Sequence, residues 1–146
     1  MKPTHGIAAL AVLALVAFGC QPITDSRPVL EQRPGVLTLS GEPSITVPAE
    51  GTAGAPVIVT VITWGGGCAR QGPTAASVSG LIADVTPFDS VVVSLPSNMA
   101  CPADIRSYTH TATILFSAAG PAVVRVHGWS EPAKAAITVE RAIQIR

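Results

Sequence analysis

The chain has 146 residues, with nine basic and nine acidic side chains and a formal net charge of zero at pH 7. Only 12% of the residues are charged and 48% are hydrophobic. Nothing in this balance suggests the basic surface that nucleic acids require, which argues against a nucleic acid as partner.

The first twenty residues have the organisation of an export signal. Lys2 supplies a positive start, and the twelve residues from Ile7 to Phe18 are all apolar. A helix that crosses a bilayer needs about 20 such residues, whereas the apolar part of a signal peptide needs roughly 7 to 15. Residues 1–19 are therefore predicted to be a signal peptide rather than a permanent anchor helix.

The end of this leader, VAFGC at positions 16–20, resembles the lipobox of bacterial lipoproteins. In that family the leader is cleaved before the cysteine, whose sulfur carries a diacylglycerol. The resemblance implies a lipid on Cys20 that anchors an envelope protein to a membrane, the outer one if the cell has two, because Gln21 is not acidic. Ala17 and Phe18 depart from the preferred residues. Positions 17–19 also fit ordinary signal peptidase, which would give a periplasmic or secreted protein.

Residues 20–35 are expected to form a flexible tether. Prolines at positions 22, 28 and 34 alternate with charged residues, a composition that does not readily form helix or sheet. Cleavage before Cys20 would leave 127 residues (146 minus 19), with eight basic and nine acidic side chains once Lys2 is lost. That length suits a single domain, expected at 36–146.

From position 36 onward, short β-branched segments alternate with Gly, Pro and Ser, which is typical of strands separated by turns. The segments predicted to be strands are 36–40, 44–47, 56–64, 74–80, 81–88, 90–95, 108–117, 123–128 and 136–146. Val57, Val59 and Val61 share one face and are predicted to point into the core.

The clearest two-residue periodicity runs from Tyr108 to Ser117. One face carries Tyr108, His110, Ala112, Ile114 and Phe116, and the other carries mostly threonine. This pattern indicates a strand with one packed and one solvated side. In the last segment, Arg141 interrupts the inward-facing isoleucines and valine, and either a β-bulge or a guanidinium that reaches solvent would explain it.

Seven to nine short strands without a helical pattern predict an all-β fold, an antiparallel β-sandwich. The passage from Phe116 to Val126, strand–FxxxG–strand, resembles the last hairpin of bacterial immunoglobulin-like domains. The whole chain is similar to small envelope lipoproteins of bacteria that pair a lipobox with one such domain. That family likeness implies no particular activity.

Cys68 and Cys101 are the only cysteines after Cys20. In an oxidising compartment such a pair usually forms a disulfide, which is the prediction here. Both follow strand ends, in GGGC and LPSNMAC, so their loops are expected to meet at one end of the sandwich. A phosphate-binding loop is disfavoured because Ala-Arg-Gln-Gly-Pro, and no Lys-Ser or Lys-Thr, follows the glycines.

An exported metal-binding protein of the copper type, or a redox protein, is the alternative function. Cys101, His110 and His127, with Met99 as an axial ligand, are the residue types of a blue-copper site. Both histidines lie in predicted strands rather than in one short loop. His110 is more simply a hydrogen-bonded core residue and His127 a solvated one.

No enzyme signature is present: no serine lies in a GxSxG context, and the aspartates are scattered singly. No catalytic residue, metal ligand or cofactor is therefore assigned. The sequence favours a non-catalytic, lipid-anchored module of the envelope that binds an envelope protein or a glycan, or has a structural role. Trp64 and Arg70, beside the predicted disulfide, are the candidate contact residues.

Overall fold

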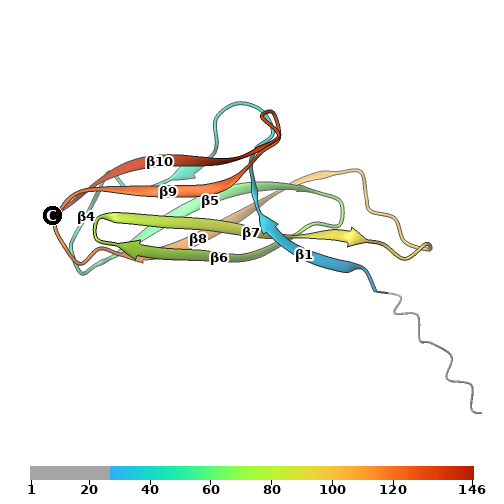
Figure 1. Cartoon of the computed structure of the whole chain (residues 1–146), viewed down its shortest axis with the longest axis horizontal. Helices are drawn as coiled ribbons and strands as arrows, with labels where there is room; N and C mark the ends of the chain where they lie inside the picture. Colours follow the sequence, from blue (N-terminus) through green and yellow to red (C-terminus); the bar gives the residue numbers. More distant parts are fainter. Residues whose placement is uncertain (1–26) are drawn as a thin grey trace, which may run out of the picture.

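The computed structural model describes residues 27–146, so the predicted signal peptide, Cys20 and positions 21–26 of the expected tether lie outside the described residues. The described part is all-β, as predicted: 67% of its residues lie in strands and none in a helix (Figure 1). No helix long and apolar enough to span a bilayer occurs between Arg27 and Arg146. The ten strands are β1 (Val29–Pro34), β2 (Val36–Thr38), β3 (Ile45–Thr46), β4 (Glu50–Gly51), β5 (Pro56–Gly66), β6 (Arg70–Ser79), β7 (Ile82–Ser94), β8 (Ile105–Leu115), β9 (Gly120–Ser130) and β10 (Ala135–Ile145).

These strands form one curled sheet with two facing halves (Figure 1). Strands β6, β7, β9 and β10 make one half, and β3, β5 and β8 make the other. Strand β2 joins them, because it pairs parallel with β9 and antiparallel with β5. The β7–β9 and β4–β10 ladders are also parallel, so the sheet is mixed where a purely antiparallel one was expected.

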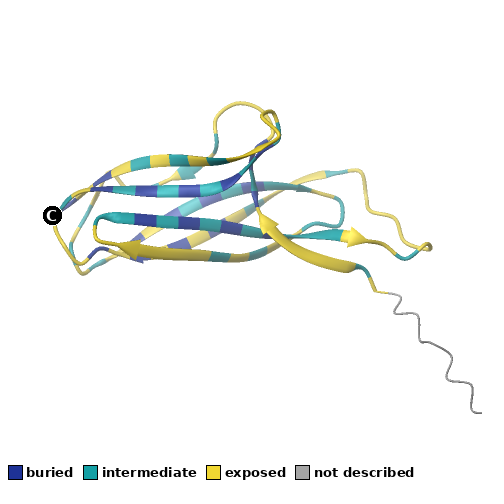
Figure 2. Ribbon diagram, in the orientation of Figure 1, coloured by how far each residue is buried: buried dark blue, intermediate teal, exposed yellow. Residues whose placement is uncertain are grey.

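The core lies between the halves, on the faces that the sequence periodicity predicted. Val57, Val59 and Val61 of β5 are at most 4% exposed, and in β8 only every second residue is buried (Figure 2). In β9, Val124 and Val126 point inward. Burial of such aliphatic side chains removes apolar surface from water at about 25 cal/mol per Å², the main stabilising contribution to the fold.

Arg141 occupies an inward-facing position of β10 without disturbing the strand. The β9–β10 register runs unbroken from Ala135 opposite Ser130 to Ile145 opposite Gly120, so no bulge is present. The Arg141 guanidinium instead reaches back to the carbonyl of Glu140 at 3.0 Å. Of the two explanations offered by the sequence, the structure supports the snorkelling side chain.

The expectation that residues 20–35 form no regular structure is wrong for 29–34. These residues form β1 and pair antiparallel with the second half of β7. Pro34 closes the strand, and β1 is an edge strand, where a missing amide donor is tolerated. At the next residue the chain crosses from one ladder to another: the Gly35 amide donates to the Pro87 carbonyl, and the Gly35 carbonyl accepts from the Trp129 amide.

A second difference concerns residues 81–95, predicted as two strands and observed as one. Strand β7 runs from Ile82 to Ser94 through the buried Pro87. Before Pro87 the strand pairs with β9, and after it with β1. The proline, which donates no amide hydrogen, lies where one partner strand replaces the other.

Candidate functional site

A row of apolar side chains crosses the outer face of the sheet near the end at which the described chain begins. Trp64 of β5 is paired with Val36 of β2, Val36 with Trp129 of β9, and Trp129 with Ala136 of β10. Directly paired residues point to the same face of a sheet. Both tryptophans of the chain therefore lie on one surface, separated by the width of β2, and both are half-buried.

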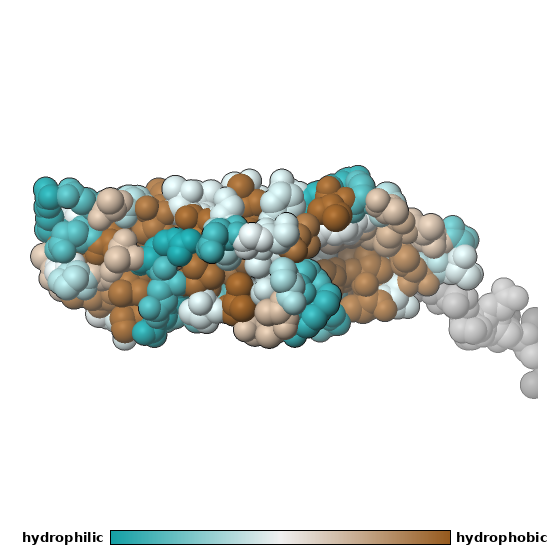
Figure 3. All heavy atoms as spheres, turned by 90° about the horizontal axis from the view of Figure 1, so that it is seen from above, coloured by the Kyte–Doolittle hydropathy of each residue, from teal (hydrophilic) through white to brown (hydrophobic). Residues whose placement is uncertain are grey.

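This row forms the floor of a groove with two lobes. One lobe, of about 420 Å³, lies between Trp64 and the loops that carry the two cysteines. The other, of about 520 Å³, lies over Trp129 and Ala136. Val36 and Val91 line both lobes, so the two lobes adjoin. Figure 3 shows hydrophobic side chains gathered around a hollow in this half of the molecule.

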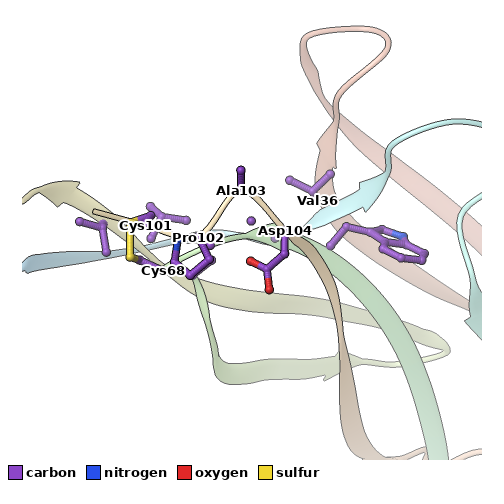
Figure 4. Close-up of a pocket in the computed structure, with 13 residues that line it drawn as sticks. Val36, Cys68, Cys101, Pro102, Ala103 and Asp104 are labelled. Carbon is purple, nitrogen blue, oxygen red and sulfur yellow. A yellow bond between two sulfur atoms is a disulfide. The ribbon is translucent and has the colours of Figure 1, made fainter. Parts of the chain in front are cut away.

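The predicted disulfide is confirmed and forms one wall of the groove. Cys68, in the β5–β6 turn, is bonded to Cys101, in the β7–β8 loop, with 5.1 Å between their Cα atoms. Pro102, Ala103 and Asp104 continue the wall, opposite Val36 (Figure 4). The two loops meet at one end of the fold, as their positions after strand ends suggested.

The glycines before Cys68 have a structural role in this wall. Gly67 has a φ of +49°, which favours glycine, and a Cβ there would lie 2.5 Å from the Pro102 carbonyl oxygen. Its amide donates to the Asp104 carbonyl at 3.0 Å. The turn is thus a close backbone contact between the loops that the disulfide joins, and it contains no helix N-terminus for a phosphate.

Side-chain hydrogen bonds of Asp104 and Tyr108 help to hold the same wall. The Arg106 guanidinium donates to the Asp104 carboxylate at 2.6 Å, which holds the pKa of Asp104 below its ordinary value. The Tyr108 hydroxyl donates to the Ala69 carbonyl at 2.7 Å. Burial raises the pKa of Tyr108, and the negative charge of Asp89 raises it further.

His110 is a core histidine, as its apolar face suggested, with a complete set of partners. Its Nε2 lies 3.0 Å from Asp89 Oδ1 and 3.1 Å from Thr63 Oγ1, and its Nδ1 lies 3.0 Å from Thr74 Oγ1. His110 is fully buried and Asp89 is 3% exposed. Neither lines the groove, so this Asp–His–Thr arrangement is not exposed to a substrate in either lobe.

His127 forms a second pair, on the outer surface. Its Nε2 lies 2.8 Å from Asp84 Oδ1, and its Nδ1 lies 2.9 Å from Thr138 Oγ1. The structure therefore does not bring His110 and His127 together, and the sulfur of Cys101 is committed to the disulfide. Among residues 27–146, no three His, Cys, Asp or Glu side chains are grouped to hold a metal ion. The copper-type alternative has no geometric support in this part of the chain.

Of the two contact residues predicted from sequence, Trp64 lines the groove and Arg70 does not. Arg70 is exposed at the start of β6, beside the disulfide loop. Sequence reasoning missed Val36, Val91 and Trp129. One signal was available: Trp64 is the last residue of the predicted strand 56–64, and Trp129 directly follows the predicted strand 123–128, so both lie at strand ends.

Comparisons with protein families, with curated proteins and with solved structures find no match to this chain. Its function therefore has to be inferred from its residues and their geometry.

Proposed function

We propose that this chain is an exported, lipid-anchored protein of the bacterial cell envelope and that its β domain is a non-catalytic binding module. The observation that carries the proposal is the Cys68–Cys101 disulfide. The fold brings together the only two cysteines after Cys20, and such bonds persist in oxidising compartments outside the cytosol. The apolar leader and the lipobox-like VAFGC support the same location.

We further propose that the domain is a β-sandwich of the immunoglobulin-like type. Two facing halves with alternating buried and exposed residues are consistent with this architecture. So is an N-terminal strand that passes from one half to the other, as β1 and β2 do at Gly35.

The groove is the proposed binding surface of this module. It is concave and mostly apolar, with two half-buried tryptophans, and tryptophan is enriched among residues that dominate binding energy. The disulfide and the Gly67–Asp104 hydrogen bond hold its wall, so less ordering is needed on binding. An envelope protein or a glycan is the proposed partner class.

Intact-mass measurement of the protein extracted from membranes tests the location and the anchor together. The expected mass is that of a chain starting at Cys20 with acyl chains attached, and reduction should add two hydrogen atoms. A Cys20→Ser variant is the control, because it should lose the acyl mass and keep the disulfide. Recovery of the protein in the cytosol with its leader intact and two free thiols would contradict the proposal.

A further inference from the structure

The end of the molecule at which the described chain begins carries six of the ten large apolar side chains that are exposed in the described residues. Ile105, the first residue of β8, is 68% exposed, and Val29 of β1 is 55% exposed. The six exposed aliphatic side chains at this end are Val29, Leu30, Val93, Leu95, Met99 and Ile105. Single exposed apolar residues need no explanation, but a gathering at one end of a domain marks an interaction surface.

The strand pairing explains why these side chains stay exposed. Beyond Ser90, β7 has left β6 and pairs only with β1 among the described strands. The result is a two-stranded ribbon, visible at the right of Figure 1, in which Val91 and Val92 line the groove together with the disulfide-bonded loops. Leu30 lies opposite Val92 in this ribbon, and Val93 follows in the same strand. A two-stranded ribbon gains little stability alone, so the exposed Leu30 and Val93 are unexplained by folding.

The charged side chains around these apolar residues balance one another. Arg33 is paired with Glu31, and Arg106 with Asp104. Arg27 and Arg70 are the other arginines of this end, and the sequence holds Asp25 and Asp89 beside them. The end is therefore apolar without an excess of either charge.

The chain's path places this end close to the proposed anchor. Cys20 precedes Val29 by nine residues, which span at most about 30 Å when fully extended. A lipid on Cys20 would therefore keep β1 and the neighbouring β7–β8 loop within this distance of the bilayer. The opposite end, with the β8–β9 turn and the C-terminus, lies a full strand length farther away (Figure 1).

We infer that this apolar end docks on the surface of the phospholipid bilayer. The inference rests on the proposed lipid anchor, and it adds a fixed orientation of the domain on the membrane. The exposed aliphatic side chains would enter the interfacial region of the bilayer, where burial of their apolar area favours binding. Trp64, two residues from the end of β5 at which Gly66 pairs with Ile105, would lie near this interface.

The test uses the chain from Gln21 onward, which contains every described residue and carries no lipid. It is mixed with vesicles of equal parts phosphatidylglycerol and phosphatidylcholine, and binding is measured by flotation and by quenching of tryptophan fluorescence with brominated lipid. Both tryptophans line the groove, so the quenching reports on this half of the molecule. Weak binding is expected, and it should change little with salt concentration, because apolar contacts are not screened as charges are.

Two substitutions on the same strand make the test specific to the proposed face. Ile105→Asp alters the docking end, and Leu115→Asp alters the opposite end of β8, where Leu115 is 53% exposed. Ile105→Asp should lower the partition coefficient about tenfold, as expected for loss of one buried aliphatic side chain. Leu115→Asp should leave it unchanged. Equal effects of the two substitutions would overturn the inference, as would no binding at all, or a self-association that Ile105→Asp abolishes without any vesicle binding.

The vesicle-binding result is independent of the lipid anchor. Absence of acyl chains in the intact mass would refute the anchor even if the unlipidated domain binds vesicles. If the protein is acylated but Ile105→Asp and Leu115→Asp change vesicle binding equally, docking is refuted and the anchor remains.

Discussion

Removal of the disulfide should destabilise the domain mainly through the unfolded chain. In a Cys68→Ser/Cys101→Ser double variant, the unfolded state regains the freedom of a loop that the bond closes over 33 residues. The loop-closure relation gives about 3.7 kcal/mol for this length at 25 °C. Cys101 is exposed and Cys68 half-buried, so little core packing is lost along with the bond.

The assay is urea and thermal unfolding of the domain, followed by circular dichroism. For a domain between 100 and 150 residues, a shift of about 4 °C per kcal/mol is expected, so the melting temperature should fall by about 15 °C. The reduced wild-type protein should match the double variant. If the free energy of unfolding falls by less than about 1 kcal/mol in both the double variant and the reduced protein, the reasoning is refuted. Such a result would mean that the unfolded chain is already restricted without the bond.

The other predictions concern the buried and the surface His–Asp pairs and the two shifted pKa values. His110→Ala should cost about 3 to 5 kcal/mol in urea unfolding, because it leaves the buried Asp89 without its partner. The matched change in the exposed pair, His127→Ala, should cost at most about 1 kcal/mol. Because the folded pKa of Asp104 is lowered, its stabilising effect should be present above the ordinary value of 3.8 and lost as the pH falls through the folded pKa. Thermal scans at acid pH should show this loss in the wild type and a flatter curve in Asp104→Asn. The folded pKa of Tyr108 is raised, so stability should fall as the pH rises above 10.0 toward the folded pKa. Tyr108→Phe should remove this alkaline slope, and an unchanged slope would assign it to another group.

The sequence predicted the central strands well because their burial follows chain periodicity. In β5 and β8 each strand is covered on one face only, so valine, isoleucine and histidine alternate with threonine in register with burial. His110 fits this pattern because its partners, Asp89, Thr63 and Thr74, compensate for its burial. These partners come from three other strands, so the network itself left no local signal.

Strand β1 was missed because local composition and tertiary pairing disagree. Two prolines and alternating charges describe a segment with weak strand propensity. The segment nevertheless pairs with β7, where its edge position tolerates Pro34 and leaves its charges in water. The break predicted between residues 88 and 90 was also wrong, although the predicted strand 81–88 correctly included Pro87. Here β7 exchanges one partner strand for another at this residue.

The groove could not be predicted from sequence because its floor depends on contacts between distant segments. Val36 and Trp129 become neighbours only through the parallel pairing of β2 with β9. That pairing requires close approach at Gly128, where a Cβ would lie 2.5 Å from the Leu37 side chain. Neither a single glycine in a β-strand nor a short parallel ladder has a recognisable sequence signature.

The position of the disulfide relative to the core connects stability with the proposed binding surface. The last buried residue of β5 is Thr63 and the first of β8 is His110, and the Cys68–Cys101 bond lies beyond both, outside the hydrophobic core. In the folded state the bond is therefore part of the groove wall. The other interactions that hold the loops of this wall are chiefly two hydrogen bonds, from Gly67 to Asp104 and from Tyr108 to Ala69. A cross-link placed there stabilises the whole domain by restricting the unfolded chain, and within the folded state it orders the wall of the groove. A binding surface formed by loops requires such ordering, whereas the valine-rich core does not.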